Sequence, residues 1–258
     1  MDIREIAGID QNYYSINREE RNYAAIFFTA LCRPGNITKF LELCDCDLSE
    51  QVSDDFGIYF EYAYLRDLWY RIDDEEIKKE IIRENLKIKG IDQLLSKPTV
   101  EINENFGVAG TASDRYIQFP GKWSLKKYYR NFPDSDDLLK ICKFKWSFNI
   151  KPDIVIHLDK DTAICIEAKY ESREGFYPSS GEEKKIFYDM GLDFVGQTEL
   201  QKYMMEDLLG IESEFIFLVY KKQQSDSHRV ISWQEAFDIL DLTDMPNFAL
   251  RMIENISG

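Results

Sequence analysis

Two short apolar runs separated by a polar loop are the clearest pattern along this chain. Residues 153–158 and 162–166 are rich in β-branched side chains, which favour strands over helices. The residues between them, Asp159-Lys160-Asp161, are few and polar enough to form a tight hairpin loop. The pattern therefore predicts two antiparallel strands that are neighbours in one sheet.

The length of this loop sets which side chains face one another. If its three residues are the whole loop, Leu158 pairs with Thr162 and Asp153 lies directly opposite Glu167, with Cβ atoms about 5 Å apart. A two-residue loop would shift the register and move Asp153 to the other face. The three-residue loop is expected to need Asp161 in a left-handed conformation, which Asp tolerates better than most residues.

The alternation of side chains along the second strand places a lysine on the same face as the two carboxylates. Glu167 and Lys169 share a face and Ala168 points to the other, because side chains alternate along a strand. Two opposed carboxylates repel and weaken a sheet, so a chain keeps them most easily when a cation lies between them. His157 shares the face of Asp153 and is interpreted as a packed, hydrogen-bonded histidine rather than a base.

Helical spacing of apolar residues dominates the remainder of the chain, and the first 95 residues are expected to be mostly helical. The predicted helices are one opened by an Asn17–Glu20 capping box, one from Asn36 to Leu43, 56–72, 73–89, short helices from Ser124 and Ser135, one with Gln197 and Gln201, one opened by a Ser232–Glu235 capping box, and 246–256; the further predicted strands are 98–102, 144–150 and 215–220.

The motif Pro152-Asp153, followed after thirteen residues by Glu167-Ala168-Lys169, resembles the signature of the PD-(D/E)XK nuclease superfamily. The resemblance covers roughly residues 135–240, where the order strand, strand, helix, strand is similar to that of the family's core. It implies an α/β fold: a restriction-endonuclease-like mixed β-sheet core flanked by helices, with a mainly helical N-terminal region. The corresponding division is a helical region 1–132 packed on a nuclease-like core 133–258.

The resemblance also implies a catalytic metal. Asp153 and Glu167 would bind Mg²⁺ through their carboxylates and Ala168 through its backbone carbonyl, since this hard cation prefers oxygen ligands. Mn²⁺ is expected to substitute. Lys169 would orient the attacking water or offset charge that develops on the phosphorus, and bound metal would make hydroxide available near neutral pH.

Three further residues are candidates for the same site. Gln197 and Gln201 lie one helical turn apart and share a face, where they could contact a substrate phosphate or a metal-bound water. The exonuclease branch of the family has a tyrosine four residues after such a glutamine, and this chain departs from that pattern because Gln201 stands there. Glu20 is either a further metal ligand, as on an early helix of some family members, or the last residue of its own capping box.

Composition places the chain among ordinary globular proteins. Its 258 residues are 44% hydrophobic and 31% charged, and they can bury a sizeable core in one large domain or two small ones. The N-terminus does not resemble a signal peptide, no apolar run is long enough to span a membrane, and five scattered cysteines indicate reduced thiols and a cytoplasmic location. Cys44 and Cys46 lack the second pair of ligands that a zinc site needs.

The net charge of −15 opposes nucleic-acid binding, which requires lysine and arginine. Residues 115–151 are the exception, with nine basic and three acidic side chains. Cations and aromatic rings alternate there, and they could bind phosphates and stack on bases; the alternative is a solvated helix face whose rings point into the core. The candidates for nucleic-acid contact are Lys122, Trp123, Lys126, Lys127, Arg130 and Gln201.

These observations predict a Mg²⁺-dependent nuclease, a DNA endonuclease, with nucleic acid as its partner and no membrane association. A homodimer is an open alternative to a monomer. Two other functions compete: a nucleic-acid-binding or assembly protein that keeps the fold without cutting, and a structural α/β protein whose acidic pair collects calcium. The complete set of Asp153, Glu167 and Lys169 favours the nuclease.

Overall fold

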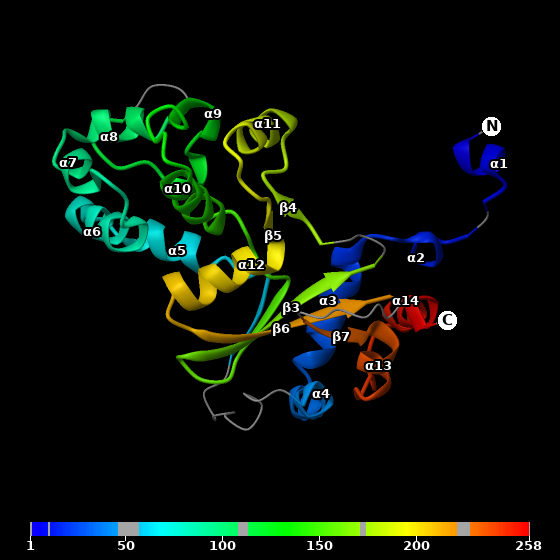
Figure 1. Ribbon diagram of the computed structural model, residues 1–258. Helices are drawn as coiled ribbons and strands as arrows, with labels where there is room; N and C mark the ends of the chain where they lie inside the picture. Colours follow the sequence, from blue (N-terminus) through cyan, green and yellow to red (C-terminus); the bar gives the residue numbers. More distant parts are fainter. Residues whose placement is uncertain are drawn as a thin grey trace. The chain divides into compact units, whose positions relative to one another are not determined.

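The apolar runs of the sequence assemble into a five-stranded mixed sheet (Figure 1). Its order is β1-β2-β3-β6-β7. The first two pairings are antiparallel and the last two are parallel. The strands are β1 (Gly57–Phe60), β2 (Ile154–His157), β3 (Thr162–Lys169), β6 (Glu212–Val219) and β7 (Arg229–Ser232). The chain is thus a mixed α/β protein, in agreement with the predicted class.

The computed structural model describes residues 2–9, 11–45, 57–107, 113–170, 174–220 and 228–257. They form two units, each assembled from separate segments of the chain. The first unit comprises residues 1–62, 152–173 and 212–258, and the second comprises 63–151 and 174–211. The predicted division between residues 132 and 133 coincides with no limit of either unit. The two N-terminal helices at Glu20–Leu31 and Asn36–Cys44 belong with the sheet because their apolar faces pack against it, whereas the helices between residues 63 and 132 belong to the second unit.

The register of β2 and β3 is the predicted one. Ile154 lies opposite Ile166, and the N–H of Leu158 donates to the carbonyl of Thr162 at 3.0 Å. One step beyond Ile154 and Ile166, this register places Asp153 opposite Glu167. The hairpin loop therefore has three residues, and the carboxylate pair follows from its odd length.

The conformation of the loop differs from the one expected. Asp161 does not have a positive φ, so the predicted left-handed conformation is wrong. Instead, Oδ1 of Asp159 accepts hydrogen bonds from the backbone N–H groups of Asp161 and Thr162, both at 2.7 Å. Such a side chain can mimic a backbone turn, and it holds the loop without a strained residue.

Four helices cover one face of the sheet: α3 (Glu20–Leu31), α4 (Asn36–Cys44), α13 (Trp233–Asp238) and α14 (Asn247–Ser257). The even-numbered residues of β2 and β3, such as Ile156 and Ile166, pack against them in one continuous core. The odd-numbered residues Asp153, Glu167 and Lys169 consequently lie on the opposite face. The predicted Ser232–Glu235 capping box opens α13.

The side chain of Asn36 links two backbone segments of this core by hydrogen bonds. Its Nδ2 donates to the carbonyls of Ala30 at 2.8 Å and Asp241 at 2.9 Å, and its Oδ1 accepts from the N–H of Asp241 at 2.8 Å. The side chain is fully buried. We expect Asn36→Ala to lower the free energy of unfolding by about 2–3 kcal/mol, because three backbone groups each lose a hydrogen bond in the interior. Urea denaturation measures this, and the exposed Asn255→Ala, which removes one bond to Tyr14, should change it by less than about 0.5 kcal/mol.

The second unit is mainly helical and holds a small two-stranded sheet of β4 and β5. The remaining elements, with the first two in the first unit, are α1 (Ile3–Ala7), α2 (Tyr13–Ile16), α5 (Tyr64–Arg71), α6 (Glu75–Leu86), α7 (Ile91–Leu95), α8 (Thr99–Asn105), η2 (Pro120–Lys122), α9 (Leu125–Tyr128), α10 (Ser135–Ser147), β4 (Phe176–Tyr177), α11 (Gly181–Asp189), β5 (Val195–Gly196), α12 (Gln197–Lys202) and the π-helical η3 (Tyr203–Leu208).

Three predicted elements are wrong. Residues 144–150 are not a strand, because α10 runs to Ser147 from an N-cap at Asp134 whose carboxylate accepts two backbone N–H groups. The predicted strand 98–102 is the start of α8, with Pro98 at its N-cap. The predicted helix 56–72 is β1 followed by α5; its helical spacing of apolar residues also fits a half-buried edge strand.

No helix within the described ranges is both long and apolar enough to cross a membrane.

Candidate functional site

Four charged side chains of the first unit meet at the carboxyl end of β3. They are Glu20 from the start of α3, Asp153 from the residue before β2, and Glu167 and Lys169 from β3; we call them the acidic cluster. Nζ of Lys169 lies 2.6 Å from Oε1 of Glu167 and 3.7 Å from Oε1 of Glu20. The side chains of Lys169 and Glu167 are 11% and 6% exposed, so this cation and its main partner are largely removed from water.

Asp153 is fixed by hydrogen bonds to its side chain and its backbone. Oδ2 accepts from the N–H of Ala168 at 2.8 Å. The carbonyl of Asp153 accepts from the N–H of Glu61 at 2.7 Å, and the carbonyl of Pro152 accepts from the N–H of Tyr62 at 3.0 Å. The carboxylate therefore has one defined position beside β3.

The surroundings of Asp153 disfavour a negative charge on its carboxyl group beside that of Glu167. Burial and the charge of Glu167 raise the pKa of Asp153 to about 7, against the opposing effects of the Ala168 N–H and of Lys169. Burial acts to lower the pKa of Lys169, but the charges of Glu167, Glu20 and Asp153 outweigh it and the pKa is raised. Lys169 is thus a permanent cation. A further positive charge nearby would stabilise the ionised carboxylate of Asp153.

Glu20 joins this cluster instead of closing a capping box. The N-cap of α3 is Glu19, without a side-chain hydrogen bond to the helix, and Oδ1 of Asn17 accepts from the N–H of Glu19 at 2.8 Å. Oε2 of Glu20 accepts from the N–H of Tyr170 at 2.9 Å. The capping box is therefore not formed, and the role of Glu20 as a metal ligand stays a prediction.

The donor set fits a hard divalent cation. Three carboxylates surround one ammonium, which leaves two negative charges in excess when all three are ionised, and carboxylate oxygens are the ligands that Mg²⁺ prefers. The described residues hold no group of three or more His, Cys, Asp or Glu side chains arranged to bind a metal. An ion here would therefore be held by one or two carboxylates with water and substrate oxygens, which is the usual coordination of Mg²⁺.

Three tyrosines lie beside the cluster, and the sequence did not single them out. The rings of Tyr23 and Tyr170 are stacked with centroids 5.3 Å apart, and those of Tyr170 and Tyr220 with centroids 5.0 Å apart. Burial, followed by the neighbouring Tyr170 and Tyr220, raises the pKa of Tyr23 to about 12. The sequence offered one signal for this placement: Tyr170 directly follows Lys169. The stack braces the backbone that presents Lys169.

Gln197 and Gln201 belong to the second unit. Gln197 is half-buried at the start of α12, where its N–H donates to the carbonyl of Gly175 at 2.8 Å. Gln201 is fully buried. Its contact with nucleic acid and the role of Gln197 in catalysis both stay predictions.

The basic segment, residues 115–151, has cations at its surface, but the ring of Trp123 is not exposed there. Trp123 is 2% exposed and stacks on Phe106 with centroids 3.8 Å apart, so it has no open face for a base; the interpretation with rings turned into the core holds for this residue. Lys126 pairs with Glu182, and Arg130 lies on the ring of Tyr129. Lys122, Lys126, Lys127 and Arg130 are exposed, and their contact with phosphate remains untested.

His157 is packed and hydrogen-bonded, as predicted. Its Nε2 lies 2.8 Å from the hydroxyl of Tyr62, and burial lowers its pKa. Of the two cysteines considered for zinc, Cys44 is buried, and Cys46 lies outside the described residues.

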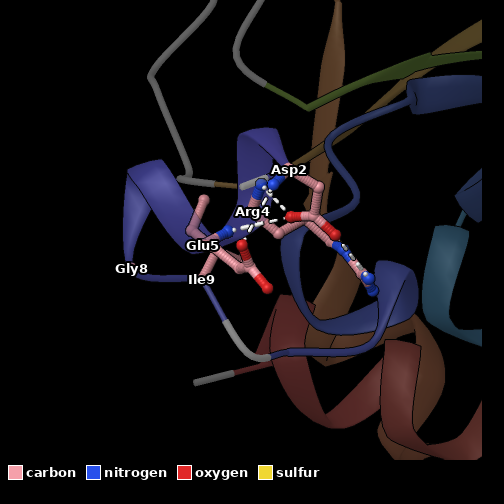
Figure 2. Close-up of a pocket in the computed structure, with 5 residues that line it drawn as sticks. All are labelled: Asp2, Arg4, Glu5, Gly8 and Ile9. Atoms are coloured by element: carbon pink, nitrogen blue, oxygen red, sulfur yellow. Dashed lines mark hydrogen bonds and ion pairs between the residues drawn. The ribbon is translucent and has the colours of Figure 1, made fainter.

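A hollow beside α1 offers no comparable chemistry. It is lined by Asp2, Arg4, Glu5, Gly8 and Ile9 (Figure 2). Its polar groups satisfy one another: Asp2 accepts from the N–H groups of Arg4 and Glu5 and from the guanidinium of Arg4. The side chains there are exposed, and nothing in the arrangement indicates a ligand.

Comparisons of the chain with protein-family models, with curated proteins and with solved structures gave no match.

Proposed function

We propose that this chain is a metal-dependent nuclease of the PD-(D/E)XK type, with a restriction-endonuclease-like core, that hydrolyses phosphodiester bonds of DNA as an endonuclease. The observation that carries the proposal is the pairing of β2 with β3, which opposes Asp153 to Glu167 and places Lys169 on the same face. Further support comes from the order of elements: this hairpin is followed by α12 and then by β6, parallel to β3.

Each residue has a role that its position permits. Asp153 and Glu167 would hold Mg²⁺, with the Ala168 carbonyl as a further oxygen donor, or Glu20 would take the place of one of these carboxylates; Mn²⁺ has the same preference for oxygen. When bound, such an ion lowers the pKa of water and stabilises charge on a phosphate. Lys169, ion-paired to Glu167 at 2.6 Å, would orient the attacking water or stabilise negative charge at the reacting phosphate.

The proposal is tested with labelled single- and double-stranded DNA and RNA, incubated with Mg²⁺, Mn²⁺, Ca²⁺ or EDTA. We expect cleavage of DNA with Mg²⁺ or Mn²⁺ and none in EDTA, because the acidic cluster repels phosphate without a cation. Asp153→Ala should abolish cleavage, measured as product per enzyme over time. Asp161→Ala is the matched control: it removes an exposed carboxylate from the same hairpin and should cleave as wild type does.

Three results would contradict the proposal. Cleavage that persists with Asp153→Ala would assign it to another site or a contaminant. DNA binding without cleavage under every metal would favour the non-cutting binding protein, and binding of Ca²⁺ alone, without nucleic acid, would favour the structural protein.

A further inference from the structure

We propose that Arg21 contacts a phosphate of the nucleic-acid substrate, and that Glu61 holds its guanidinium ready at the rim of the acidic cluster until the substrate displaces it. This inference rests on the proposed function, and it names a substrate contact outside the motif. It begins from position: Arg21 follows Glu20 in the first turn of α3. Its Nε lies 3.3 Å from Oε1 of Glu61.

Glu61 connects this ion pair to Asp153. The N–H of Glu61 donates to the Asp153 carbonyl at 2.7 Å, and Glu61 has a φ of 54°. A residue other than glycine is uncommon in this left-handed region and remains there only where its surroundings hold it. Arg21 is thus next in sequence to one carboxylate of the cluster and, through Glu61, one hydrogen bond from the residue that bears another.

Charge explains why a phosphate needs this residue. The acidic cluster has two negative charges in excess, and a divalent cation only cancels them. Lys169 is 11% exposed and engaged by Glu167, whereas the side chain of Arg21 is 69% exposed. Arg21, the residue after Glu20, therefore supplies an accessible positive charge, while an incoming phosphate diester adds one negative charge.

The ion pair leaves most of the guanidinium available. Within the described ranges, Arg21 forms an ion pair with Glu61 through Nε alone. Arginine has five N–H donors in a planar fork that matches phosphate oxygens in pairs. An exposed ion pair in water is weak, so a phosphate held bidentately can replace Glu61. Glu61 then acts as a competitor, and its removal should strengthen binding.

The test is a pair of variants with opposite expected effects. Fluorescence anisotropy of a labelled DNA 20-mer, with Ca²⁺ in place of Mg²⁺, gives Kd for the full chain. We expect Arg21→Gln to raise Kd roughly 5- to 100-fold and to reduce the slope of log Kd against log salt by about 0.9. Glu61→Gln should lower Kd by roughly 2- to 5-fold.

Cleavage kinetics with Mg²⁺ give a second measurement. Arg21→Gln should raise KM with kcat changed less than about 3-fold, and Arg21→Lys should recover part of the lost substrate affinity.

Arg4 and Asp2 supply the matched controls. They form an exposed pair at 3.1 Å in the same unit, with the Arg4 side chain 72% exposed. Arg4→Gln and Asp2→Asn change the net charge by the same amounts and should shift Kd less than about 2-fold. Urea denaturation of each variant confirms that it is folded.

The outcomes separate this inference from the proposed function. If wild type cleaves DNA and Arg21→Gln binds and cleaves like the controls, Arg21 is no contact and the nuclease proposal stands. If Glu61→Gln weakens binding as Arg21→Gln does, the pair is structural and the displacement is wrong. If wild type binds DNA through Arg21 but never cleaves it, the nuclease proposal fails and the contact stands; if it binds no nucleic acid, both fail.

Discussion

Asp153→Asn is expected to stabilise the protein in the absence of metal while it removes cleavage. Burial and Glu167 raise the pKa of Asp153 to about 7, so above that pH the native state holds a carboxylate that would bind a proton more tightly than the unfolded chain does. An amide of the same shape relieves this repulsion and keeps an acceptor for the Ala168 N–H. At pH 8 in EDTA, we expect a gain of roughly 1–3 kcal/mol in the free energy of unfolding.

The sign of the pH dependence follows from the raised pKa. Between about pH 4 and pH 7 the native state binds more protons at Asp153 than the unfolded state, so the stability from this group falls as the pH rises through that window. The difference between Asp153→Asn and wild type should therefore be near zero at pH 4, grow up to about pH 7, and remain constant above it.

Urea denaturation at pH 5 and pH 8, with EDTA or with Mg²⁺, measures both effects. Mg²⁺ should stabilise wild type at pH 8 and stabilise Asp153→Asn much less, because binding to the native state adds stability by mass action. Asp161→Asn, in the exposed hairpin loop, is the control and should follow wild type. Equal stabilisation of wild type and Asp153→Asn by Mg²⁺ would place the metal elsewhere.

Lys169→Gln is expected to separate metal binding from cleavage. The variant keeps all three carboxylates and removes the cation that engages Glu167 at 2.6 Å, so Mg²⁺ and Mn²⁺ should bind at least as tightly as in wild type. Cleavage should fall roughly 10²- to 10⁴-fold, since a positioned cation or proton donor typically contributes that much. Calorimetric titration of metal and initial cleavage rates measure the two quantities.

Folding of this variant has to be established, because an unpaired buried Glu167 costs several kcal/mol. Mg²⁺ should restore much of that stability, and Lys169→Arg keeps the charge if the glutamine variant does not fold. Lys160→Gln is the control, since Lys160 is exposed in the hairpin loop. Wild-type cleavage by a folded Lys169→Gln would exclude Lys169 from the chemistry.

The central pair of carboxylates could be predicted from sequence because it depends on local rules. The loop of residues 159–161 fixes the register, and the alternation of side chains along a strand then determines which residues share a face. The position of Glu20 could not be decided in this way. A glutamate three residues after Asn17 fits a capping box equally well, and only the packing of α3 on the sheet brings it to Tyr170.

Ambiguous patterns account for what failed. Residues 144–150 alternate apolar and polar side chains as a strand does, yet the cap at Asp134 and the packing of α10 made residues 144–147 helical. Trp123 stands among lysines, but a large ring contributes more by burial against Phe106 than at the surface. Glu61 gave no signal, because its left-handed backbone and its bond to Asp153 arise from tertiary structure.

The discontinuity of the sheet has a consequence for biosynthesis. Helices α3 and α4 emerge from the ribosome with their apolar faces exposed, long before β2, β3 and β6, against which those faces pack, have been translated. The residues of the second unit intervene twice, so the first unit can close only after its last segment, which begins at residue 212, has been translated. Contacts of such sequence separation form slowly and leave nascent chains prone to aggregation. Newly made chains should therefore depend on chaperones that shield these helices.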